Sequence, residues 1–139
     1  MSAENHKALF RRYFGEGANQ GDLSVIDDVF AVAYIHHDPA NVDSIGGVDD
    51  VKRHIITLRQ AFPDLAFTIH DEIADDHNVV VRWTVSGTHT GDYFGIPPTG
   101  KTFAVTGMNH WRMADGKAIE GWASRDDMGL MRQLGLMPG

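Results

Sequence analysis

The chain of 139 residues contains no cysteine and has few basic residues. Without cysteine there can be no disulfide, no thiolate nucleophile and no cysteine-ligated zinc site. The 12 Lys and Arg residues are scattered and stand against 19 Asp and Glu, for a formal net charge of -7. Nucleic acids and anionic membranes are bound through clustered positive charge, so we expect neither as a partner.

Long hydrophobic runs are also missing. The sequence has no stretch of about 18 apolar residues, the length that a membrane-spanning helix needs, and MSAENHKALF lacks the charged-then-apolar order of a signal peptide. We therefore expect a cytoplasmic protein. The 42% of hydrophobic residues, in a chain of one-domain length, predict a single domain over residues 1–139 with one core.

The first half of the chain predicts three helices. Apolar residues at three- and four-residue spacing mark one helix around residues 9–14, which ends in GEGANQGD. A second short helix is expected to begin after Asp22, a suitable N-cap residue. The third, over residues 48–62, is the clearest, because two aspartates suit its first turn and Pro63 ends it.

After Pro63 apolar and polar residues alternate, which is the period of a β-strand. This pattern predicts strands over residues 65–69, 79–85, 103–113 and 117–124, the last two joined by a hairpin at ADGK. Helices followed by an antiparallel meander predict an α+β fold, with three helices packed on one face of a curved antiparallel sheet.

The hairpin decides which side chains face the helices. A three-residue loop with Gly116 in the left-handed conformation would pair Met113 with Lys117. The same register would place Asn109 opposite Gly121, as the one polar group on an apolar concave face, where it needs a hydrogen-bond partner or a ligand. The opposite face is amphipathic and predicts a homodimer interface. Its residues are Met108, His110, Arg112, Glu120, Trp122 and Ser124.

The segment YIHHDPANVDS places two histidines and an aspartate in a row. Asp38, which precedes a proline, is either a turn residue that bonds nearby backbone or a reacting group. In an extended chain His36 and His37 point to opposite sides, and we favour His36 for the pocket because it lies on the side of Tyr34 and Asp38. Neighbouring side chains diverge, so the trio is a poor metal site and we expect no metal.

Taken together, several segments resemble the SnoaL-like polyketide cyclase family, small proteins of the NTF2-like cone fold. The resemblance covers nearly the whole chain and rests on AFPDL, VVVRWTVSGTHTG, YFGIPPTGK and GMNHWRMADGKAIEGW followed by DDMGLMRQLG. It implies a pocket between sheet and helices, a dimer through the outer sheet face, and no metal or organic cofactor. The best-understood members close a polyketide ring by intramolecular aldol condensation of an ester.

The chain departs from that family at two positions. The family's acid/base, an aspartate in the last strand, corresponds to Ala123, and a histidine in the preceding strand corresponds to Asn109. Alanine cannot transfer a proton. Asp126, three residues further on, is expected either to replace the missing acid, if the backbone turns it inward, or to cap the last helix.

The sequence also resembles the ketosteroid isomerases, which share the cone fold. Their general base is an aspartate directly before a proline, as Asp38 is, while Tyr13 lies close to their catalytic tyrosine and Asn109 matches a neutral carboxylic acid. This resemblance implies Asp38 or His36 as the base and Asn109 with Tyr13 as hydrogen-bond donors to an enolate.

Aromatic and small residues are expected to hold the ligand. Trp83 and Trp111 would form an apolar wall, and His89 would reach the pocket mouth or else lie at a fraying strand end. The YFGIPPTGK loop, which contains Phe94, is either a lid or a rigid connection. The expected substrate-binding residues are Phe62, Trp83, His89, Phe94, Trp111, Gly121 and Ala123.

These observations predict a cofactor-independent enzyme for a small apolar carbonyl substrate, which removes a proton from carbon and stabilises the enolate. Isomerisation of a cyclic ketone is the nearest alternative. A non-catalytic binding protein also stays open, because Gly121 and Ala123 leave volume where an acid would stand.

Overall fold

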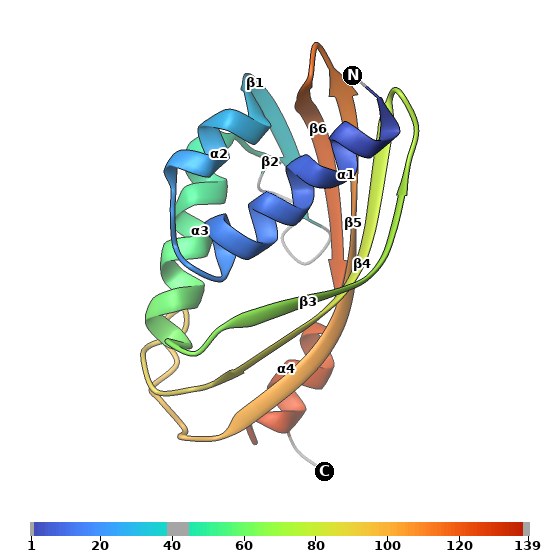
Figure 1. Ribbon diagram of the computed structural model, residues 1–139. Helices are drawn as coiled ribbons and strands as arrows, with labels where there is room; N and C mark the ends of the chain where they lie inside the picture. The colour runs from blue at the N-terminus through green and yellow to red at the C-terminus, as the bar shows by residue number, and fades with distance from the viewer. Residues whose placement is uncertain (1, 39–44, 138–139) are drawn as a thin grey trace.

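The computed structural model describes residues 2–38 and 45–137. Its strands are β1 (Phe30–His37), β2 (Ile45–Gly46), β3 (Ala66–Ala74), β4 (Asn78–Thr88), β5 (Thr102–Ala114) and β6 (Lys117–Arg125). They form one curved sheet in the order β2-β1-β6-β5-β4-β3 (Figure 1). Neighbouring strands are antiparallel except β1 and β6, which run parallel.

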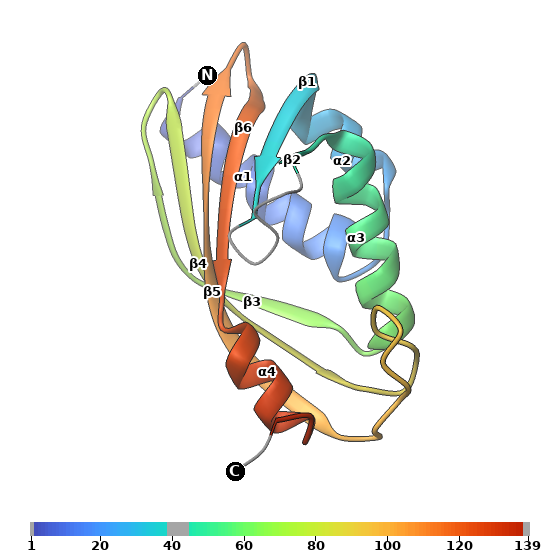
Figure 2. The same cartoon turned by 180° about the vertical axis from the view of Figure 1, so that it is seen from behind.

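Most of the helices cover the concave side of this sheet. The helices are α1 (Ala3–Arg12), the π-helical segment η1 (Tyr13–Ala18), α2 (Ser24–Val29), α3 (Val48–Ala61) and α4 (Asp127–Gln133). The first four lie over the concavity, whereas α4 follows β6 near the opposite end of the sheet (Figure 2). The predicted α+β fold is confirmed, with α4 as an addition to the three predicted helices. None of the helices in the described residues is long and apolar enough to cross a membrane.

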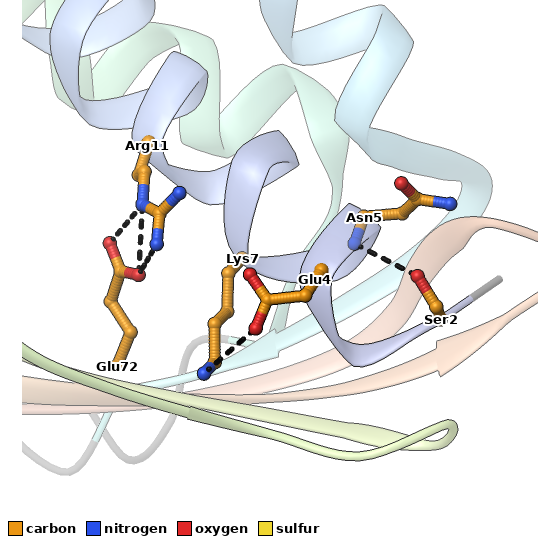
Figure 3. Close-up of polar contacts among 6 residues, drawn as sticks. All are labelled: Ser2, Glu4, Asn5, Lys7, Arg11 and Glu72. Atoms are coloured by element: carbon orange, nitrogen blue, oxygen red, sulfur yellow. Dashed lines mark hydrogen bonds and ion pairs between the residues drawn. The ribbon is translucent and has the colours of Figure 1, made fainter.

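Helix α1 is held at its start and to the sheet by side chains (Figure 3). The Ser2 Oγ accepts a hydrogen bond from the Asn5 backbone N–H (3.2 Å) and caps the helix. Further along, Arg11 donates to both carboxylate oxygens of Glu72 on β3, at 2.7 Å from Nε and 2.6 Å from Nη2. Tyr13 is the first residue after this helix.

The segment after α2 is a strand that begins at Phe30, whereas the apolar spacing of Leu23, Ile26, Val29 and Phe30 predicted that the second helix would include Phe30. Helix α2 ends at Val29, and β1 then carries Tyr34 and His36 alongside β6. The alternation in β1 is irregular, because its register with β6 shifts between Phe30 and Ile35. A strand with such a bulge lacks the strict two-residue period by which we recognised the other strands.

The β5–β6 hairpin has a two-residue turn, and the predicted three-residue loop is wrong. Asp115 and Gly116 both have positive φ, 52° and 78°, as a type I′ turn requires. Together with a register shift between Arg112 and Met113, this turn pairs Asn109 with Ala123, and not with Gly121 as predicted. The register shift absorbs one residue and leaves Ile119 exposed, so the inward face of β6 beyond it is the predicted one.

The core lies between the helices and the inner face of the sheet. Phe10 of α1 stacks on Trp111 of β5, with ring centroids 3.9 Å apart and planes 13° apart. Phe14 and Tyr13 pack around the same indole. This aromatic cluster closes one end of the concavity and leaves the β1 side for a cavity.

Candidate active site

A cavity of about 680 Å³ opens between α3, β1 and the end of β6. Pockets of roughly 300–1,000 Å³ are typical of small-molecule sites. Aromatic side chains form much of its wall. They are Tyr13, Phe30, Tyr34, Tyr93, Phe94 and Trp111.

A charged cluster lies on one side of this cavity, at the end of β6. The Arg125 guanidinium donates to Asp38 Oδ2 (2.8 Å) and to Asp127 Oδ1 (2.9 Å). Burial lowers the pKa of Arg125, but the two carboxylates together raise it more, so its pKa is above the ordinary value. The guanidinium thus stays charged and holds Asp38, which is 20% exposed, at the cavity wall.

Two histidines of the wall are neutral at neutral pH. Burial lowers the pKa of His54 on α3 to about 4, and Arg125 lowers it further while Asp38 opposes the shift. Burial likewise lowers the pKa of His36. The His36 Nδ1 atom lies 2.7 Å from the Tyr34 hydroxyl. Both imidazoles therefore present uncharged nitrogen atoms to the site.

Tyr13 contributes a hydroxyl group to the same cavity. Burial raises the pKa of Tyr13, so the phenol keeps its proton. Its hydroxyl makes no hydrogen bond with any residue that the structure describes, although the ring packs against Phe30 and Trp111. A neutral O–H donor is thus available to a ligand.

Two predicted catalytic residues lie elsewhere. Asn109 is not among the described residues that line the cavity, and its Oδ1 accepts a hydrogen bond from the Trp83 indole (2.7 Å). Asp126 caps α4 by accepting from the Gly129 backbone N–H (2.8 Å), the second of the two roles expected for it. The turn expected around Asp38 depends on Pro39, which lies outside the described residues.

The predicted substrate-binding residues divide in the same way. Trp111 and Phe94 line the cavity, and the others are not among its described lining residues. His89 is fully buried, bonds Thr99 through Nδ1 (3.1 Å) and packs on the Phe62 ring. The remaining four residues outside the described lining are Phe62, Trp83, Gly121 and Ala123.

The volume expected at Gly121 is already filled. A Cβ atom at this position would clash with the Tyr34 hydroxyl and would lie 2.9 Å from Trp111 Nε1. The glycine therefore admits a protein side chain from the neighbouring strand, and it does not enlarge the cavity. Sequence reasoning gave this space to a ligand because it did not recognise β1 as a strand beside β6.

The lining residues that were not predicted include three titratable ones, Arg125, Asp127 and His54. Arg125 follows Gly121 and Ala123 at two-residue spacing, so strand alternation could have placed it on the inner face. His54 lies one helical turn after Val51, on the face of α3 that meets the cavity. Asp127 opens α4 and carries no comparable signal. Among the described residues, no group of three or more His, Asp or Glu side chains is arranged to hold a metal ion.

Comparisons with known proteins agree with this architecture. A family model described as SnoaL-like polyketide cyclase matches residues 8–134. Among solved structures, AclR, a proposed hydroxylase from Streptomyces galilaeus, is 28% identical with a TM-score of 0.86, over 99% of this chain and 89% of AclR. TsrD from Streptomyces laurentii is 27% identical with a TM-score of 0.88, over 99% of both chains.

IdmH, a proposed polyketide cyclase from Streptomyces antibioticus, is 26% identical with a TM-score of 0.82, over 94% of this chain and 98% of IdmH. No curated protein sequence matches the chain. The family model nevertheless spans most of the sequence, and the neighbours share the whole fold. The protein belongs to the SnoaL-like polyketide cyclase family.

Proposed function

We propose that the protein is a cyclase-type enzyme that removes a proton from the carbon next to a carbonyl group and stabilises the resulting enolate. One observation carries this proposal: the Asp38 carboxylate and the Tyr13 hydroxyl line the same aromatic-walled cavity. Proton abstraction from carbon needs a base, a donor for the developing oxyanion and a site shielded from water.

In this reaction Asp38 is the base. Its carboxylate takes the proton, the electrons of the broken C–H bond form the enolate double bond, and the carbonyl oxygen gains the negative charge. The Tyr13 O–H donates a hydrogen bond to that oxygen. In a cyclisation the enolate carbon then attacks a second carbonyl carbon of the same substrate and forms the ring bond. The π electrons of that second carbonyl move to its oxygen, which takes back the proton held by Asp38. Arg125 holds the carboxylate in place at 2.8 Å.

The charges of the wall favour a neutral substrate. Both arginines that line the cavity in the described residues are already ion-paired, Arg125 with two aspartates and Arg53 with Asp50. An anionic ligand would have to displace one of these carboxylates. Flat, uncharged carbonyl compounds suit the aromatic wall better. No cofactor is needed for such a step.

Deuterium exchange at the α-carbon of α-tetralone, followed by proton NMR in deuterium oxide, tests the proposal. The wild type should accelerate exchange, and Asp38→Asn should reduce the acceleration by at least about 10²-fold, within the range for a positioned base. Asp71→Asn is the matched control, since Asp71 is an exposed, arginine-paired aspartate on β3. Exchange no faster than in buffer would favour a non-catalytic binding protein.

A further inference from the structure

Three residues of the cavity wall lie close together on the inner face of the sheet near Gly121: Tyr34, His36 and Trp111. Tyr34 and His36 lie on one face of β1, and Trp111 lies on β5 across β6. The Tyr34 hydroxyl is 2.7 Å from His36 Nδ1. A Cβ atom on Gly121 would meet both this hydroxyl and the Trp111 indole nitrogen, so the two groups lie over the same glycine.

The proton on each of these groups can be assigned from what each can donate and accept. An indole N–H can only donate a hydrogen bond. The Trp111 N–H is buried and makes no hydrogen bond of normal geometry with a described residue. It lies beside an acceptor, the Tyr34 hydroxyl oxygen. Burial and the nearby Tyr13 raise the pKa of Tyr34, and the Trp111 N–H lowers it by a smaller amount. Tyr34 therefore keeps its proton.

That proton needs an acceptor, because Tyr34 is 2% exposed. Among the described residues the only acceptor that its hydroxyl has is His36 Nδ1. If Tyr34 donates to Nδ1, the neutral imidazole must carry its own proton on Nε2. The reverse tautomer would leave the buried Tyr34 O–H without a described acceptor.

We infer that Trp111 and Tyr34 fix His36 as a neutral Nε2–H donor, which hydrogen-bonds the carbonyl oxygen of the substrate and stabilises the enolate. The inference rests on the proposed function, since an oxyanion donor matters only where an oxyanion forms. Burial, which lowers the pKa of His36, keeps the ring uncharged. His36 Nε2 makes no hydrogen bond with a described residue, so this donor is available to a ligand.

The assignment changes the role that the sequence left open for His36. A base needs an unprotonated nitrogen facing the substrate, whereas this tautomer presents a proton there. His36 then acts with Tyr13 on the carbonyl oxygen and leaves Asp38 as the base. Tyr34 and Trp111 are positioning residues, because they act through the imidazole.

NMR of protein with isotope-labelled histidine tests the tautomer without any substrate. Two-bond nitrogen–proton couplings distinguish the Nε2–H form from the Nδ1–H form, and the His36 signals are assigned by their loss in His36→Gln. We expect the Nε2–H form at neutral pH, and a shift of the Nδ1 signal in Tyr34→Phe, which removes the hydrogen bond. A wild-type His36 in the Nδ1–H form overturns the inference.

Exchange of α-tetralone then tests the role in catalysis. His36→Ala should slow the exchange by about 10²-fold or more, as for the loss of an oxyanion donor, and His36→Gln should stay within about tenfold of wild type because its amide replaces the N–H. Equal losses in the two variants overturn the donor role. If Asp38→Asn has no effect, the proposed function fails even where the tautomer is as inferred.

Discussion

The two adjacent histidines of β1 show how one strand serves two different environments. His36 faces the cavity, bonds the Tyr34 hydroxyl and is kept neutral by burial. His37 faces the outer side of the sheet, where its Nε2 lies 2.8 Å from Glu120 and its ring stacks on Trp122. Strand alternation alone separates them, so the neighbours of each ring decide its chemistry.

The arginines of the two faces differ in the same manner. Arg125 is 21% exposed and holds two carboxylates at the cavity. Arg112 is 53% exposed, pairs with Glu120 at 3.2 Å and lies over Trp122. Ion pairs near the surface contribute little to stability, whereas removing one partner of a shielded pair leaves uncompensated charge. The inner face thus depends on its polar contacts far more than the outer face does.

The largest stability difference should separate these two arginines. Arg125→Met leaves Asp38 and Asp127 close together without their shared cation, and we expect a loss of about 3 kcal/mol in the free energy of unfolding. Arg112→Met should change it by less than about 1 kcal/mol. Urea unfolding at neutral pH measures both. Equal losses would contradict the contrast between the faces.

A pH dependence should follow from His54. Its pKa is lowered from 6.5 to about 4 by burial, so the unfolded chain takes up a proton at higher pH than the native one. The contribution of His54 to the free energy of unfolding is fully present above pH 6.5. It falls as the pH drops towards 4, by up to about 3 kcal/mol.

His54→Gln should flatten that dependence, as measured by urea unfolding across the same pH range. His77→Gln, on the exposed turn between β3 and β4, is the matched control and should leave the slope unchanged. A slope that persists in His54→Gln would assign the effect to another group.

A smaller effect is expected where the Tyr34 hydroxyl occupies the space over Gly121. Gly121→Ala would push Tyr34 and Trp111 apart, and we expect a loss of about 1–3 kcal/mol. Gly15→Ala has open space around the new methyl group and should cost less than about 0.5 kcal/mol. In a Tyr34→Phe background part of the Gly121→Ala loss should be recovered, which thermal unfolding would show.

The smallest effect on folding is expected on the outer face. Homodimerisation through this face stays a prediction, based on its exposed apolar and aromatic residues around Trp122 and Met108. Trp122→Ala should leave unfolding of the single chain within about 1 kcal/mol and shift the molecule towards monomer in analytical ultracentrifugation. A monomeric wild type at micromolar concentration would remove this prediction.

The sequence predicted much of the fold because most elements have regular periods. The apolar spacing of residues 48–62 predicted α3 to within a residue, and the alternation after Pro63 predicted β3 to β6. Strand β1 was missed because its bulge breaks the alternation. The predicted hairpin register was wrong along its whole length, since the Asp115–Gly116 signal was assigned to a longer loop, although the inward face of β6 beyond Ile119 was predicted correctly.

The candidate site was less predictable, because it depends on which strand lies beside which. The resemblance to known families placed Asp38 and Tyr13 at the cavity. It gave no reason to expect that Trp83 would bond Asn109, or that Tyr34 would fill the space over Gly121. Both contacts join residues whose pairing depends on the sheet order. Strand alternation could have placed Arg125 on the inner face of the sheet. It was not predicted, because only groups that transfer protons were considered as candidates.

The most direct measurement of the central claim is the exchange rate of bound α-tetralone at saturating concentration, in wild type and in Asp38→Asn. Saturation removes any difference in affinity, so the ratio of rates reports the chemical step alone. The account predicts a fall of at least about 10²-fold with little change in the dissociation constant for β-naphthol. An unchanged rate would contradict it and would leave a cavity that binds ligand without acting on it.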